Sequence, residues 1–279
     1  MRAMPDAQPP RMQHHFIEGA PRLHYSLSSA NSPPTLVLLH GSTQHAGAWN
    51  DVVPMLPDYR VAALDLRGHS ESEWNGAYSP DDYLNDVDRL IGALDVPSIA
   101  LAGHSMGSLI AMRYTAARPD RVSAAIFVDI DARPPDSQDE NLRRAGAPDG
   151  LSFDSTDEAR ASIKRLRADV ADGTLQRLMS ANFLARGDGY IECYDRQTLA
   201  QFAPWDNREL LAKIECPTLV LRGGESTVHS RDAGDEMMCT LPNAEFHEFP
   251  KLSHMLHLEQ PAEIAASIDI FLRETGNGA

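Results

Sequence analysis

The chain has 279 residues, a formal net charge of −15 at pH 7 and three cysteines. This length suits one α/β core with an insertion, and the negative charge disfavours polyanions, so we expect no nucleic-acid partner. The sequence contains no run of eighteen apolar residues and no apolar signal segment at its start, which predicts a cytoplasmic protein without a membrane partner. The odd, widely spaced cysteines favour neither a disulfide framework nor a zinc site.

Short apolar runs alternate with helical patterns along most of the chain. The runs predict strands at 35–40, 60–66, 98–103, 122–130, 218–222 and 245–249. The patterns between them predict helices at 80–94, 106–118, 231–240 and 262–273. This alternation is typical of a mostly parallel sheet with helices on both faces.

The alternation breaks after Ile130. Arg133 is followed by two prolines, and the chain then shows helical rather than strand periodicity. A capping box at 155–158 predicts a helix to about residue 171, and a second helix is expected at 174–185. We therefore predict two parts of one core at 1–131 and 206–279, and a helical cap at 132–205 that covers the edge of the sheet.

The segment Gly103-His104-Ser105-Met106-Gly107 stands between a predicted strand and a predicted helix. A strand-to-helix turn this sharp exposes its serine at the top of the sheet, and glycines avoid collisions with the flanking backbone. The helix N-terminus behind the serine favours negative charge. Ser105 is therefore predicted to be a nucleophile, and a plain tight turn is the alternative.

With three further segments, this turn resembles the α/β-hydrolase fold family, in its group of serine hydrolases with a helical cap after strand six. The segments are Leu39-His40-Gly41-Ser42, Asp65-Leu66-Arg67-Gly68-His69-Ser70 and Leu252-Ser253-His254-Met255-Leu256-His257-Leu258-Glu259. The resemblance covers nearly the whole chain and implies an α/β fold with the order nucleophile, acid, histidine. Asp65 and Arg67 are expected to hold a turn together.

A serine hydroxyl needs a neighbouring imidazole to take its proton. The resemblance places that base at His254, after the last predicted strand, with His257 as the alternative. His104 is expected to pack or hydrogen-bond near the turn. We assign surface or capping roles to five other histidines: His14, His15, His24, His229 and His247.

The acid that should orient His254 departs from the commonest family pattern. Many relatives carry an aspartate after the strand at 218–222, but Thr227 stands at that position here and cannot supply the charge. The family's other location is the end of strand six, so we predict Asp129, with a cap or turn role as the structural alternative. Glu225 and Asp131 are the second and third candidates.

The resemblance also implies an oxyanion hole made of the backbone N–H groups of Ser42 and Met106, because charge develops on the substrate carbonyl oxygen. The mechanism needs no metal and no cofactor. Arginines of the cap can hold a carboxylate in two-point geometry, although most are expected to lie on solvated helix faces. Possible substrate-binding residues are Arg133, Arg144 and Arg167, and Trp205 for an apolar pocket.

We expect a hydrolase that cleaves a carboxylic ester, lactone or amide of a small substrate, carboxylated substrates included, through an acyl-enzyme. One alternative is a carbon–carbon bond hydrolase of vinylogous diketones, and another is a non-catalytic ligand-binding member of the fold. A haloalkane dehalogenase is excluded because its nucleophile at position 105 would be an aspartate. The protein is expected to act as a monomer or homodimer.

Overall fold

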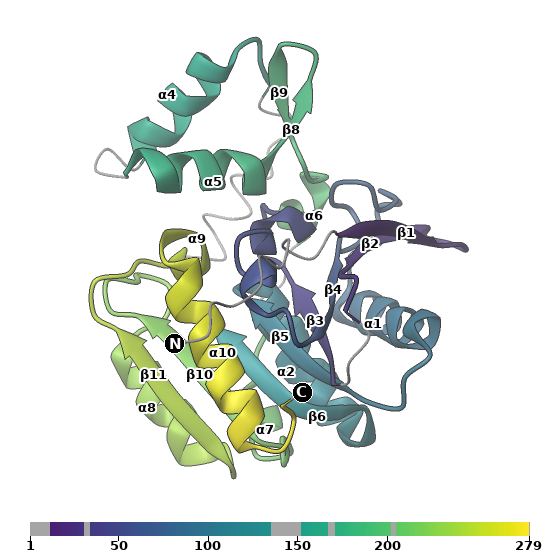
Figure 1. The fold of residues 1–279 in the computed structure, drawn as a ribbon, viewed down its shortest axis with the longest axis vertical. Coiled ribbons are helices and arrows are strands. Elements are labelled where there is room, and N and C mark those ends of the chain that lie inside the picture. Colours follow the sequence, from purple (N-terminus) through teal and green to yellow (C-terminus); the bar gives the residue numbers. More distant parts are fainter. Residues whose placement is uncertain (1–11, 31–33, 135–151, 167–170, 202–204, 279) are drawn as a thin grey trace, which may run out of the picture.

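The computed structural model describes residues 12–30, 34–134, 152–166, 171–201 and 205–278 (Figure 1). Its main sheet has eight strands in the order β1-β2-β4-β3-β5-β6-β10-β11. Their bounds are Gln13–Ile17 (β1), Leu23–Leu27 (β2), Thr35–Leu39 (β3), Arg60–Leu64 (β4), Ile99–His104 (β5), Val122–Val128 (β6), Thr218–Gly223 (β10) and Ala244–Phe249 (β11).

All neighbours from β4 to β11 pair in parallel, whereas β1 and β2 form an antiparallel hairpin that adds to β4. The register sets His104 opposite Val128, and Val128 opposite Leu221. Because parallel strands end at the same edge, the residues that follow β3, β5, β6 and β10 meet there. Ser105 and Asp129 directly follow β5 and β6 at this edge.

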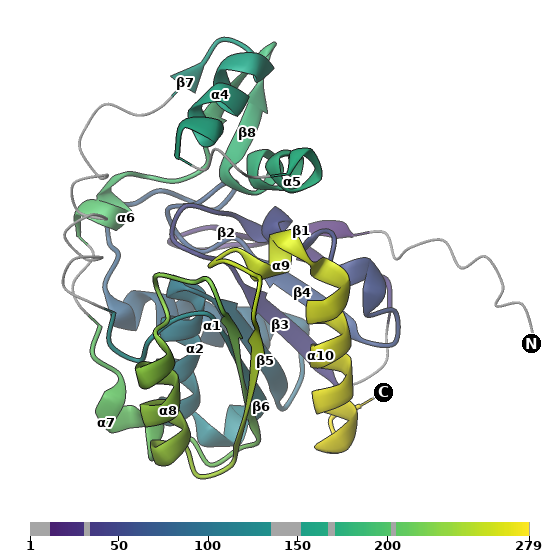
Figure 2. The same ribbon diagram turned by 90° about the vertical axis from the view of Figure 1, so that its left-hand side faces the viewer.

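Helices cover both faces of this sheet (Figures 1 and 2). On one face lie Pro80–Leu94 (α1), Met106–Ala117 (α2), Arg208–Leu211 (α7) and Arg231–Thr240 (α8). On the other face lies Pro261–Glu274 (α10), preceded by the short Leu256–Glu259 (α9). The central strands alternate between the two layers: Leu101 packs in the α2 layer and Ala102 in the α10 layer, as the two-residue period of a strand requires.

Helix α1 shows how local sequence sets an element. The Ser79 side chain accepts the Asp82 N–H, and the Asp82 carboxylate accepts the Ser79 N–H, which together form a capping box. The chain leaves the helix at Asp95, which has a left-handed backbone with φ 53°. Between these ends, the apolar residues at helical spacing are buried against the sheet.

The cap lies beyond the carboxyl edge of the main sheet (Figure 2). Its elements are Ser152–Phe153 (β7), Thr156–Leu166 (α4), Asp172–Asn182 (α5), Phe183–Arg186 (β8), Gly189–Glu192 (β9) and Gln197–Ala200 (α6). The strands form an antiparallel sheet in the order β7-β9-β8.

The cap contains the small sheet β7-β9-β8 in addition to helices, and these strands were not predicted from the sequence. The helix predicted at 174–185 ends at Asn182, and β8 turns into β9 through a two-residue loop. Gly187 in that loop has a positive φ of 61°, which favours a hairpin. A side chain at Gly189 would lie 2.1 Å from the Phe153 carbonyl oxygen, so glycine lets β7 approach.

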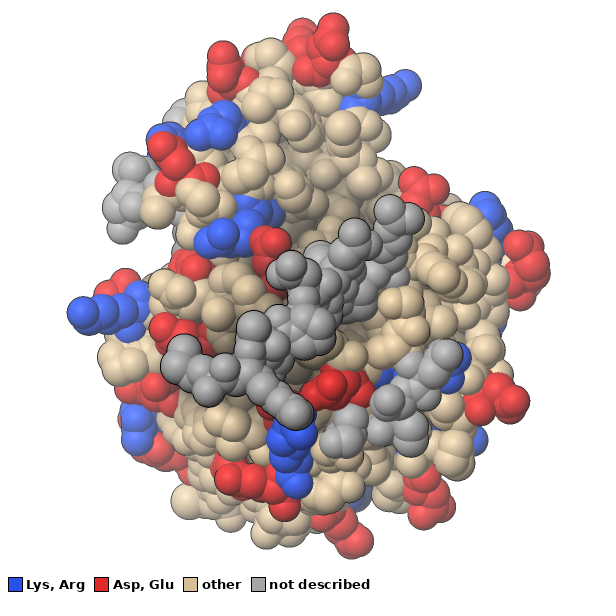
Figure 3. All heavy atoms as spheres, viewed as in Figure 1, with Lys and Arg blue, Asp and Glu red and all other residues tan. Residues whose placement is uncertain are grey.

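Acidic and basic side chains are interspersed on the face shown in Figure 3, where basic groups stand singly or in small groups. None of the helices in the described ranges combines the length and the apolar character needed to span a bilayer. The predicted boundaries of core and cap, at 131/132 and 205/206, stay a prediction.

Candidate active site

The turn between β5 and α2 holds Ser105 in a strained backbone conformation, with φ 52° and ψ −119°. A Cβ at Gly103 would lie 2.2 Å from the Gly107 carbonyl carbon, and a Cβ at Gly107 would lie 2.6 Å from the Leu39 carbonyl oxygen. Both glycines are thus required by close backbone contacts, as the motif predicts. Positive φ at a non-glycine residue costs energy and is typical of functional sites.

Ser108 fastens this turn to the end of β6. Its hydroxyl donates to the Gly103 carbonyl at 2.5 Å and accepts from the Val128 N–H at 2.9 Å. The Ser105 N–H donates to the Val128 carbonyl at 2.9 Å. Because Asp129 directly follows Val128, these bonds fix the distance between the serine and the strand that bears the aspartate.

Asp129 contacts His254 directly. The His254 Nδ1 lies 2.7 Å from the Asp129 Oδ2, and the Asp129 side chain is fully buried. This carboxylate also accepts the Gly223 N–H at 2.7 Å and the Ser226 hydroxyl. Burial alone would raise the pKa of Asp129, but the bonds from His254, Ser226 and Gly223 outweigh it and lower the pKa. The carboxylate is therefore held ionised.

The loop that bears His254 is attached to the turn of Ser105 through His104. The His104 Nε2 donates to the His254 carbonyl at 2.9 Å, and the two rings lie 4.6 Å apart. His104 immediately precedes Ser105, so this bond brings the His254 loop to the serine. His104 is fully buried, and burial lowers its pKa to about 3.

The alternative base and acids lie elsewhere. His257 is buried between Trp49 and His104, and among the described residues neither of its ring nitrogens has a hydrogen-bond partner. Glu225 is exposed. Asp131 accepts the Ser230 N–H at 3.1 Å. In the described part of the chain, neither of these two acids is hydrogen-bonded to His254, so the geometry favours Asp129.

Ser226 is a site residue that the sequence did not reveal. It precedes Thr227, the position at which many relatives carry their aspartate, and its hydroxyl donates to the Asp129 Oδ2, the same oxygen that His254 contacts. The sequence offered one signal for this role: a serine stands beside Thr227, in the segment where many relatives carry their aspartate. It supplies Asp129, which directly follows β6, with a donor from the loop after β10.

The two proposed oxyanion donors come from adjacent segments. Ser42 belongs to a turn closed by the bond from the Gln44 N–H to the Gly41 carbonyl, at 3.1 Å, and Met106 is the first residue of α2. Within the described residues, neither the Ser42 N–H nor the Met106 N–H is bonded to an acceptor. Both donors are therefore available for an oxygen outside the chain.

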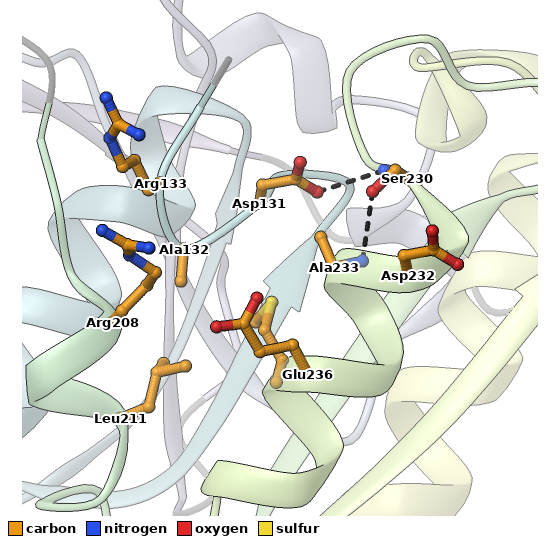
Figure 4. Close-up of a pocket in the computed structure, with 10 residues that line it drawn as sticks. Asp131, Ala132, Arg133, Arg208, Leu211, Ser230, Asp232, Ala233 and Glu236 are labelled. Atoms are coloured by element: carbon orange, nitrogen blue, oxygen red, sulfur yellow. Dashed lines mark hydrogen bonds between the residues drawn. The ribbon is translucent and has the colours of Figure 1, made fainter.

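Arg133 lines a pocket of about 290 Å³ with Asp131, Arg208 and the start of α8 (Figure 4). Burial raises the pKa of Asp131 in this pocket to about 6. Neither Ser105 nor His254 lines it.

Trp205 is buried in the main core and packs against Tyr83, a position that does not favour a role in substrate binding. Arg144 and Arg167 lie outside the described residues.

Two histidines that we assigned to surface or capping roles are buried. The His24 Nδ1 donates to the Asp65 carboxylate at 2.7 Å, and His229 is fully buried with its Nε2 3.9 Å from Asp131. Both rings fill core positions, and for His24 the partner is distant in sequence.

Asp65 also accepts the Ala46 N–H, and Arg67 pairs with Asp86 at 2.6 Å, which agrees with the turn-holding role expected of them. The described residues bring together no group of His, Cys, Asp or Glu suited to a metal ion.

Comparison with known proteins places this geometry in a family. The chain is 32% identical to Lipase LipV of Mycobacterium tuberculosis over 107 residues, which is 38% of this chain and 41% of that protein. It is 28% identical over 270 residues to the 2-hydroxy-6-oxononadienedioate/2-hydroxy-6-oxononatrienedioate hydrolase of Paraburkholderia xenovorans, which covers 91% of this chain and 92% of that enzyme.

The crystal structure of E-2-(acetamidomethylene)succinate hydrolase superposes with a TM-score of 0.84 at 19% identity, over 94% of this chain and 100% of that one. This likeness confirms the predicted fold class. The family model described as the alpha/beta hydrolase family matches residues 36–267. The chain belongs to the alpha/beta hydrolase family.

Proposed function

We propose that the protein is a serine hydrolase that cleaves a carboxylic ester, lactone or amide of a small substrate through an acyl-enzyme. The observation that carries this proposal is the 2.7 Å contact between the His254 Nδ1 and the buried Asp129 carboxylate. This contact occupies Nδ1 of the His254 ring and leaves Nε2 to act as a base. The loop of His254 is bonded to His104, which directly precedes the strained Ser105. A ligand-binding protein has no need of such an arrangement.

In the proposed mechanism, His254 Nε2 takes the proton of the Ser105 hydroxyl while the Ser105 oxygen bonds to the substrate carbonyl carbon. The negative charge moves to the carbonyl oxygen, where the Ser42 and Met106 N–H groups stabilise it. The imidazolium, stabilised by Asp129, gives its proton to the leaving group as the scissile bond breaks. Water then attacks the acyl-enzyme with His254 again as base, which releases the acid and restores Ser105.

A carbon–carbon bond hydrolase is the second candidate. It is favoured by the similarity to the Paraburkholderia xenovorans enzyme, which extends over nearly the full length of both chains. The names of that enzyme and of E-2-(acetamidomethylene)succinate hydrolase both describe dicarboxylates, which supports a carboxylated substrate. Both reactions would use the same three side chains.

The test compares three variants on a panel containing a small ester, an amide, a monoester of succinate and a 2-hydroxy-6-oxodienoate. We expect Ser105→Ala and Asp129→Asn to lower kcat by on the order of 10³-fold or more. Glu225→Gln is the matched carboxylate-to-amide control and should retain activity, because Glu225 is exposed. Circular dichroism verifies folding.

Full activity of Ser105→Ala would contradict the proposed function. Loss of activity in Glu225→Gln but not in Asp129→Asn would move the acid to the loop after β10. The substrate that is turned over distinguishes the two candidate reactions.

A further inference from the structure

The cap is bonded to the turn that carries a proposed oxyanion donor. Asn182, the last residue of α5, donates from its Nδ2 to the Thr43 carbonyl at 3.1 Å and to the Thr43 hydroxyl at 2.9 Å. The Cys193 thiol, just after β9, donates to the same carbonyl at 3.4 Å. Thr43 directly follows Ser42, so two parts of the cap converge on the residue next to that donor.

Three other hydrogen bonds of this turn do not involve the cap. The Gly41 N–H donates to the Gln44 Oε1 at 3.0 Å, and the Gln44 N–H donates to the Gly41 carbonyl. The Ser42 carbonyl accepts from the His69 Nε2 at 2.9 Å. The Gly41 carbonyl, which belongs to the same planar peptide as the Ser42 N–H, also accepts from the His40 Nδ1 at 2.8 Å. The core therefore holds the first peptide of this turn, and the cap holds Thr43.

The cap does not need Asn182 merely to stay attached. Arg177 on the same helix donates from its Nη2 to the Glu259 carbonyl at 3.3 Å and from its Nε to the Leu258 carbonyl. The Ser180 carbonyl accepts from the His45 Nε2 at 2.8 Å. Apolar contacts between α5 and α9 add to these bonds. The bonds of Asn182 differ from these because their acceptors belong to Thr43, in the same turn as Ser42.

We propose that Asn182 is a positioning residue, which holds Thr43 and thereby keeps the turn in the conformation that presents the Ser42 N–H to the developing oxyanion. The cap then does more than cover the substrate, because the oxyanion hole is complete only when α5 is docked. A displacement of the order of an ångström at a catalytic group costs about 10²-fold in rate. This inference rests on the proposed function.

The test uses Asn182→Asp, which keeps the size of the side chain but replaces its donor by an acceptor facing the Thr43 carbonyl. Asn182→Ala is the second variant if the first does not fold. Arg177→Gln is the control, since it also removes hydrogen bonds between the cap and the core. We measure the rate at which a fluorophosphonate modifies Ser105, by intact-protein mass, together with kcat and KM on the best ester.

We expect Asn182→Asp to lower kcat and the rate of phosphonylation by roughly 10- to 100-fold, because both reactions place charge on an oxygen in the hole. KM should stay within about twofold of the parent value, because the loss lies in the transition state. Thr43→Val, which removes the hydroxyl partner, should give a smaller loss that does not add fully to that of Asn182→Asp. Arg177→Gln should lower both rates by less than about threefold, since an exposed or partly exposed contact remote from the turn contributes little.

The outcomes separate the two proposals. A parent protein that is not modified at Ser105 contradicts the proposed function. A parent that is modified, with Asn182 variants reacting at the parental rate, overturns the role of Asn182 alone. Equal losses in Asn182→Asp and Arg177→Gln also overturn it, because docking of the cap in general would then explain the effect.

Discussion

The core and the cap are stabilised by different means. In the core, large side chains such as Trp49, Tyr83 and Phe127 are almost completely buried on the two faces of an eight-stranded sheet. In the cap, one small cluster includes Phe153 and Met179 under a sheet whose strands have two to four residues. From this difference we expect the cap to be able to unfold locally while the large core stays folded.

A matched pair of substitutions tests this division most strongly. Phe127→Ala in β6 should lower the free energy of global unfolding by about 3–5 kcal/mol, because it leaves a cavity in the core. Phe153→Ala in β7 removes the same side chain from the cap, where it packs edge-on against Phe183. We expect it to leave global unfolding unchanged and to open α4 and α5 locally, which peptide-level hydrogen exchange detects.

If Phe153→Ala lowered the global unfolding energy as much as Phe127→Ala, core and cap would unfold as one unit. The comparison would then fail, and the cap would have to be counted as part of the core.

Acid should act on the core more than on the cap, since all eleven histidines lie outside 132–205. Burial lowers the pKa of His104 to about 3 and of His229 to about 4, and lowers that of His257 well below its usual value. The unfolded chain therefore binds more protons as the pH falls below about 6.5, and stability falls with it. Asp131 has the opposite effect, because burial raises its pKa to about 6 and the folded chain therefore takes up this one proton before the unfolded chain does.

Each such histidine should remove about 1.4 kcal/mol of stability at pH 5.5 relative to neutral pH. His257→Leu is the test, because neither ring nitrogen of His257 has a partner among the described residues. Urea unfolding of this variant should show a decline smaller by that amount between pH 7.5 and 5.5. A decline equal to that of the parent would show that His257 takes up a proton in the folded state.

The smallest effect is expected at the surface of the cap. Asp172 begins α5 and pairs with Arg160 at 3.4 Å and Lys164 at 3.2 Å, and its side chain is 78% exposed. Asp172→Asn should change the local stability of the cap by less than ~1 kcal/mol, and 1 M salt should remove most of the difference. A larger, salt-independent loss in hydrogen exchange would mean that ion pairs, rather than the apolar cluster, hold α4 on α5.

The core could be predicted because its elements are long and locally encoded. The helix expected at 80–94 is found with those bounds, and the strand expected at 122–130 ends at Val128. The hairpin of β1 and β2 was missed because its residues include His14, His15 and His24 rather than an apolar run. The cap strands were missed because two to four residues are too few to show a period.

The site residues also fall into those that a local sequence pattern predicts and those that it does not. Ser105 follows from a local motif, and Asp129 follows from its place at the end of a strand beside that motif. Ser226 and Asn182 act across 97 and 139 residues of sequence, and no local pattern marks such partners. Burial of His24 likewise depends on Asp65, 41 residues away.

The attachment of Asp129 has a consequence for the order of synthesis. Its three partners, Gly223, Ser226 and His254, stand 94, 97 and 125 residues further along the chain. A nascent chain therefore exposes the Ser105 turn and the cap before it has either His254, the proposed base, or the groups that hold Asp129. If the proposed function holds, Ser105 of the released protein becomes reactive only when residues 223–254 have folded onto the rest.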